Sequence, residues 1–116
     1  MRDEIVQAVE ALADPDYQWS AWVRRERALG TYDEFDYRIH ILYDDTKVLE
    51  DPGGAVGVYL CSTEEAVVMG ELAAALERLF AELGTELSDE EYLRAPGWSA
   101  VVEAARVATA VLRSGA

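Results

Sequence analysis

Residues 62–84 read STEEAVVMGELAAALERLFAELG, and this stretch decides the fold class. Ser62 and Glu65 have the spacing of a capping box, in which the two residues bond each other's backbone amides at a helix start. Gly84 is a helix stop signal. Between them, apolar residues recur every three or four positions: Val67, Val68, Leu72, Leu76, Leu79, Phe80 and Leu83. The pattern predicts one long amphipathic helix around which the other helices pack.

Two further helices are predicted after Gly84. Ser88 and Glu91 repeat the capping-box spacing before a short helix that Pro96 ends. A final helix begins near Gly97. Its apolar stripe consists of Trp98, Val101, Val102, Ala105, Ala108 and Leu112. The small alanine side chains on this stripe permit a close approach to a neighbouring helix.

Two more helices are predicted toward the N-terminus. Asp3 can cap the first one. Its apolar stripe consists of Ile5, Val6, Val9, Leu12 and Ala13. Asp14 and Pro15 fit a cap followed by a proline at the first helical position, which opens a second, short helix. Trp19 and Trp22 share one face of it, and we expect them to pack this helix onto the first; an aromatic platform for a ligand or partner is the alternative.

Residues 33–45, DEFDYRIHILYDD, fit two different structures. Apolar and polar residues alternate through 35–43, as in a strand, and 55–61 is the plausible partner strand. A helix capped by Asp33 would instead bury one stripe and leave Tyr37 and Ile41 outside it. That stripe consists of Phe35, Ile39, Leu42 and Tyr43. The period alone prefers the strand, but a two-stranded sheet is marginal by itself, so the residues leave both structures open.

The predicted fold is therefore mainly α, a small bundle of about five to six helices. An α+β fold with one short antiparallel hairpin (35–43 with 55–61) is the alternative. The 116 residues suit a single domain over 1–116. Apolar residues make up 51% of the chain, which favours a folded core over a disordered acidic tail.

Four segments together resemble a known family. They are ADPDYQ followed by Trp at 13–19, DEFDYRIHILYDDT at 33–46, GVYL at 57–60, and DEEYL with PGWSAVVEAA within 89–105. This order resembles a family of small, acidic, uncharacterised actinobacterial proteins, and the likeness covers most of the chain. The resemblance implies a mainly helical protein, which supports the helix at 35–43. It assigns no catalytic residue.

A surplus of acidic residues limits the partners of this chain. It has 23 aspartates and glutamates against 10 lysines and arginines, a formal net charge of -13. Because phosphate binding depends on clustered basic residues, we do not expect nucleic-acid binding. A negative field of this size instead attracts a basic partner, and it also keeps a small protein soluble.

The sequence predicts a cytoplasmic protein. No apolar run approaches the roughly 20 residues that span a bilayer, so no membrane association is expected. The N-terminal MRDE has no signal-peptide core. A lone Cys61 cannot form an internal disulfide, which agrees with a reducing compartment.

Two acidic stretches supply the candidate binding residues. We expect a non-enzymatic protein that presents these stretches as one face to a basic protein partner, in the manner of an immunity protein or antitoxin. The predicted partner-binding residues are Asp36, Asp44, Asp45, Glu50, Asp51, Glu86, Asp89 and Glu90, with Tyr43 and Tyr92 as contact residues. Tyr32 and Tyr59 are further candidates for such contacts.

The sequence assigns no catalytic residue, no metal site and no cofactor. His40 is the one histidine, and because its neighbours are apolar we expect a structural residue at the edge of the core. The competing hypothesis is a small-ligand or metal-dependent enzyme centred on His40 and the Asp44-Asp45 pair. Residues 44–51 lack the alternating ligands and final glutamate of a calcium loop.

Two other features have plain interpretations. Arg24, Arg25 and Arg27 form a basic cluster that we expect to make surface ion pairs. A homodimer that buries a leftover apolar patch, including Trp19 and Trp22, is a third interpretation of the chain.

Overall fold

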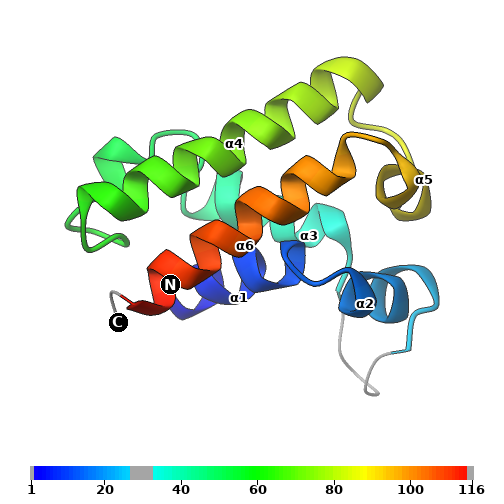
Figure 1. The fold of residues 1–116 in the computed structure, drawn as a ribbon, viewed down its shortest axis with the longest axis horizontal. Coiled ribbons are helices and arrows are strands. Elements are labelled where there is room, and N and C mark those ends of the chain that lie inside the picture. The colour runs from blue at the N-terminus through cyan, green and yellow to red at the C-terminus, as the bar shows by residue number, and fades with distance from the viewer. Residues whose placement is uncertain (1, 27–32, 115–116) are drawn as a thin grey trace.

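The computed structural model describes residues 2–26 and 33–114 (Figure 1). The α-helices in this part of the chain are α1 (Arg2–Leu12), α2 (Pro15–Gln18), α3 (Phe35–His40), α4 (Thr63–Leu83), α5 (Asp89–Arg94) and α6 (Trp98–Ser114). The π-helical segments η1 (Trp19–Val23) and η2 (Ile41–Asp45) continue α2 and α3, and a 3-10 turn, η3 (Gly53–Ala55), precedes α4. The described residues contain no strand, so the mainly α prediction is confirmed.

Helix α6 lies between α1 and α4 and packs on both (Figure 1). We expected the other helices to surround the long helix at 63–83, and the structure instead gives the central place to α6. The buried residues of α6 are those of the predicted stripe: Trp98, Val101, Val102, Ala105, Ala108 and Leu112. Helices α2 and α5 lie at one end of the molecule, and the turn around 53–60 lies at the other (Figure 1). No helix within 2–26 or 33–114 has the length and apolar composition needed to cross a membrane.

The predicted helix boundaries are formed by local hydrogen bonds. Asp14 Oδ1 accepts a bond from the Tyr17 amide at 3.1 Å, with Pro15 at the first helical position of α2. The full capping box of Ser88 and Glu91 is present at α5. Gly84 ends α4 with a φ of 79°, a left-handed conformation that glycine adopts without a steric penalty.

The glutamate of the other predicted capping box has a different role. The Ser62 hydroxyl accepts the Glu65 amide at 3.2 Å, but the Glu65 side chain points inward and is 1% exposed. Its two oxygens accept from the Arg2 guanidinium at 2.9 Å each, and Oε1 also accepts the Cys61 amide at 2.7 Å. A buried carboxylate is tolerated when it is paired in this way.

Arg2 links α1 to three other segments, one of them through this ion pair. Its guanidinium also donates to the carbonyl oxygens of Tyr59 at 2.8 Å and Leu112 at 3.1 Å. The bond from Arg2 is the main cause that holds the pKa of Glu65 below its ordinary value. Because the folded pKa is the lower one, the stability from this group is present above the unfolded pKa and is lost as the pH falls through the folded pKa.

The segment 35–45 is helical, so the hairpin alternative is wrong. Residues 55–61 form turns with a single bridge between Val56 and Leu60. Ile41, which we placed outside the buried stripe, is 4% exposed. The reason is the π turn of η2, in which the Thr46 amide bonds to the Ile41 carbonyl at 3.1 Å, because a wider turn departs from the period used to draw the stripe.

Replacing Arg2 tests the buried ion pair. Arg2→Met should lower the free energy of unfolding by about 2 to 3 kcal/mol, because it leaves the Glu65 carboxylate buried without its cation. Arg113→Met is the matched control, since Arg113 pairs with Glu10 at 2.5 Å while its own side chain is 63% exposed. The control should cost less than about 1 kcal/mol. Urea denaturation measures both, and equal losses would contradict a special role for Arg2.

Candidate partner-binding cleft

A cavity of about 610 Å³ opens where the start of α3, the end of α4 and the segment 85–92 meet. This volume lies within the range of about 300 to 1,000 Å³ that is usual for ligand pockets. We call it the cleft. It is located at the α5 end of the molecule (Figure 1).

Aromatic and aliphatic side chains line much of the cleft. They are Trp22, Val23, Phe35, Ile39, Phe80, Leu87 and Tyr92. Phe35 is central among them, because its ring centroid lies 5.9 Å from that of Trp22, 6.0 Å from Phe80 and 5.2 Å from Tyr92. A fourth neighbour, Trp98 of α6, is at 5.0 Å. These contacts fix η1, α3, α4 and α5 against α6 and leave a rigid apolar floor.

Five acidic residues line the same cleft: Glu34, Asp36, Glu86, Asp89 and Glu90. The two acidic stretches of the sequence therefore come together in part, at Glu34 and Asp36 from the first and at Glu86, Asp89 and Glu90 from the second. Arg25 is the one basic residue among the described lining residues, and its φ of 57° is a left-handed conformation.

Asp89 is one of the partly enclosed acids of the cleft. It is half-buried, and its Oδ2 accepts the backbone amide of Phe35 at 3.1 Å. Burial raises the pKa of Asp89, the bond from Phe35 opposes this effect, and the negative charges of Glu34 and Asp36 add to it. A cation in the cleft would remove this electrostatic penalty.

Asp33 is a buried carboxylate that does not line the cleft but bonds to Trp22, which does. We predicted that it caps the helix, but Glu34 occupies the N-cap position and Asp33 is 5% exposed. Arg38 donates to both of its oxygens, at 2.8 and 3.1 Å, and the Trp22 indole donates at 2.9 Å. Tyr17 donates its hydroxyl hydrogen to the same carboxylate. The network satisfies the buried charge and orients the Trp22 ring.

The remaining predicted acidic residues lie elsewhere. Asp44, Asp45, Glu50 and Asp51 do not line the cleft. The turn that follows Asp51 is at the end of the molecule opposite to α5 (Figure 1). Asp51 itself accepts the Gly54 amide at 3.1 Å and so shapes that turn. The cleft therefore brings together only part of the predicted acidic residues.

His40 is exposed, so its expected place at the edge of the core is wrong. Its side chain is 58% exposed, bonds to Asp44 through Nδ1 and lies 3.5 Å from Asp36 through Nε2. The hydrogen bond that His40 donates to Asp44, followed by the charge of Asp36, raises the pKa of His40. Within the described residues, no group of three or more His, Cys, Asp or Glu side chains is placed to hold a metal ion.

The tyrosines proposed as contact residues have structural roles as well. Tyr92 is 3% exposed and donates its hydroxyl hydrogen to the Gly84 carbonyl at 2.6 Å, so it supports the floor of the cleft. The hydroxyl of Tyr43 is buried without a hydrogen-bond partner among the described residues, and burial raises its pKa to about 12. Tyr59 is half-buried. Tyr32 lies outside the described residues.

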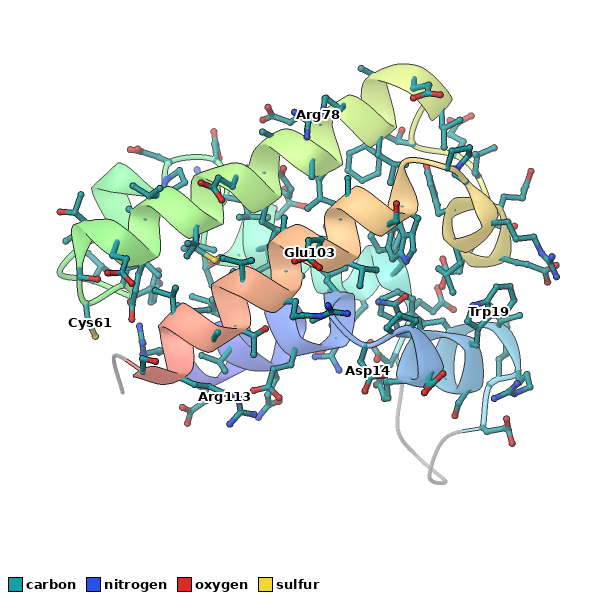
Figure 2. All side chains as sticks on the ribbon, viewed as in Figure 1. Asp14, Trp19, Cys61, Arg78, Glu103 and Arg113 are labelled. Atoms are coloured by element: carbon teal, nitrogen blue, oxygen red, sulfur yellow. The ribbon has the colours of Figure 1, made fainter. Side chains whose placement is uncertain are left out.

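Trp22 and Arg25 line the cleft, whereas Trp19 and Arg24 do not. Trp22 is 3% exposed, whereas Trp19 is partly exposed and has the Arg94 guanidinium 5.1 Å from its ring centroid (Figure 2). Arg24 forms an exposed ion pair with Glu26 at 2.5 Å, as predicted for this cluster. Arg27 is outside the described residues.

The pH dependence of stability tests the environment of Asp89. Its folded pKa is above the ordinary value of 3.8, so its contribution to stability falls as the pH rises through the folded pKa. Asp89→Asn should therefore gain stability relative to the wild type as the pH rises above the ordinary value of 3.8. Glu82→Gln, on the exposed side of α4, removes the same charge and should gain less. Urea denaturation at several pH values measures the free energy of unfolding of both variants. The same dependence on pH for the two variants would contradict this assignment.

One comparison with known proteins gives a match. No curated protein and no solved structure matches this chain. A family model matches residues 1–116, the full sequence. The chain therefore belongs to the family described as domain of unknown function DUF7945.

Proposed function

We propose that this chain is a non-enzymatic binding protein whose cleft receives a basic segment of a partner protein. The observation that carries the proposal is that five carboxylates and four aromatic rings line one cleft. Interface cores favour aromatic side chains, and complementary charge selects the partner and speeds its approach. An immunity or antitoxin-like inhibitor, which covers the cationic site of its target, is the form of this function that we favour.

The charge of the whole chain supports this proposal. A net charge of -13 attracts a cationic partner over a distance, and the cleft concentrates part of that charge at a concave surface. At physiological salt the attraction is screened within about 8 Å, so the contacts inside the cleft decide the affinity. The proposal includes the cytoplasmic location expected from the sequence.

The enzyme hypothesis ranks second. His40 and Asp44, its proposed centre, have side chains that are 58% and 63% exposed, and neither lines the cleft. Acid–base catalysis gains from a group whose pKa is tuned in a partly enclosed site, which this pair lacks. A homodimer through the tryptophans also loses support, because the Trp22 ring is covered by the chain itself.

Charge neutralisation tests the cleft as the binding site. The probe is a fluorescent peptide rich in lysine and arginine. The triple variant Glu34→Gln, Asp36→Asn, Glu86→Gln should weaken its binding by about tenfold, because it removes rim charges that face the peptide. A control triple variant, Asp45→Asn, Glu50→Gln, Glu71→Gln, makes the same change in net charge at exposed positions outside the cleft.

Fluorescence anisotropy titrations at low and at physiological salt measure both triple variants. The control should lose much less affinity than the cleft variant at physiological salt, where distant charges are screened. Equal losses for the two variants would mean that the peptide follows net charge alone, and the cleft would then not be the binding site.

Arg25 gives a test in the opposite direction. Because it is a cation that lines the cleft, Arg25→Gln should strengthen binding of the same basic peptide by about threefold. Arg113→Gln removes an equal charge from the α1 and α6 end of the molecule, far from α5 (Figure 2), and should change the affinity much less. Anisotropy titration distinguishes the two. A weaker complex for Arg25→Gln would contradict the proposed position of the peptide.

A further inference from the structure

We propose that the side chain received by the cleft is an arginine of the partner, with its guanidinium between the Asp89 carboxylate and the Phe80 ring. This inference rests on the proposed function and adds the chemical group that is recognised. It commits to a guanidinium carried by a protein segment. Lysine and free small cations are outcomes of the test.

The first argument is the available ring surface. Trp22, Phe35 and Tyr92 are each 3% exposed, so they support the floor from beneath. Phe80 lines the cleft and is partly exposed, while its ring is held at 6.0 Å from Phe35 and 5.9 Å from Tyr92. A guanidinium is planar and weakly hydrated, so it stacks on such a ring more readily than a strongly hydrated ammonium does.

The second argument is the hydrogen-bonding state of Asp89. Its Oδ2 accepts the Phe35 amide, whereas no described residue donates to Oδ1. Glu86 and Asp36 line the same cleft and supply further acceptors. The five N–H donors of a guanidinium form a rigid fork that can bond a carboxylate through two donors and keep others for a second carboxylate. An ammonium acts as a point charge and lacks this fork.

The third argument is an intramolecular example beside the cleft. Arg94 donates from Nε to Glu90 at 3.0 Å, and its guanidinium carbon lies 5.1 Å from the centroid of the Trp19 ring. One guanidinium thus contacts both a ring and a carboxylate, and Glu90 is itself a lining residue. The cleft offers the same pair of groups at Phe80 and Asp89. Arg25, the cation that lines the cleft, forms no ion pair with another described residue.

Three peptides of one sequence test the assignment. Their basic positions are all arginine, all lysine or all citrulline, which keeps the shape of arginine without its charge. In anisotropy titrations the arginine peptide should bind about tenfold more tightly than the lysine peptide of equal charge. The citrulline peptide should show no measurable binding. If free arginine displaces the arginine peptide at concentrations similar to that of the peptide, a protein segment is not the source of the guanidinium, and that part of the proposal is overturned.

Two variants locate the guanidinium. Phe80→Leu keeps an apolar side chain but removes the ring, so the preference for arginine over lysine should fall to about twofold or less. Asp89→Asn keeps an acceptor for the Phe35 amide and should weaken the arginine peptide more than the lysine peptide. Leu87→Ala is the control, because it shortens a partly buried lining residue without removing a ring or a charge. For Leu87→Ala, the ratio of the arginine-peptide affinity to the lysine-peptide affinity should stay unchanged.

The outcomes separate the two proposals. Equal binding of arginine and lysine peptides, with both weakened by the Glu34→Gln, Asp36→Asn, Glu86→Gln variant, overturns the arginine assignment and leaves the proposed function in place. Insensitivity of both peptides to that triple variant overturns both proposals. An arginine preference that survives both Phe80→Leu and Asp89→Asn overturns the proposed position. Thermal unfolding of each variant confirms that it is folded at the temperature of the titration.

Discussion

Phe35 touches four other aromatic rings, and its backbone amide is bonded to the Asp89 carboxylate. Helices α3 and α5 have only six residues each, too few to be stable as isolated helices. Their positions therefore come from this packing. Because the same ring cluster is the floor of the cleft, the arrangement that completes the core also sets the spacing of the carboxylates around it.

Local chemistry explains why much of the fold was predictable. The ends of α2, α4 and α5 are specified by side chains that bond to backbone groups three residues away or by a left-handed glycine, and such signals are visible in sequence. The stripe of α6 follows from its helical period. The register of η2 was not predictable in this way, since nothing in its composition marks the change to a π turn, and Ile41 was misplaced for that reason.

The site and the buried carboxylates were harder to predict because their neighbours come from distant parts of the chain. Glu65 has the pattern of an ordinary cap residue, yet its cation is 63 positions away. Asp33 also resembles a cap, and its bonds to Trp22 and Arg38 depend on how η1 meets α3. The sequence indicated two acidic stretches but could not show that only Glu34 and Asp36 of the first stretch would share a cleft with the second.

The bonds made by Arg2 have a consequence for the motions of the protein. Helix ends usually open first and independently, because their last turns have few bonds. Here one guanidinium joins the first turn of α1, the last turn of α6 and the beginning of α4. Amide hydrogens in these three places are therefore expected to exchange with solvent through one shared opening, so that two ends far apart in sequence act as a single cooperative unit.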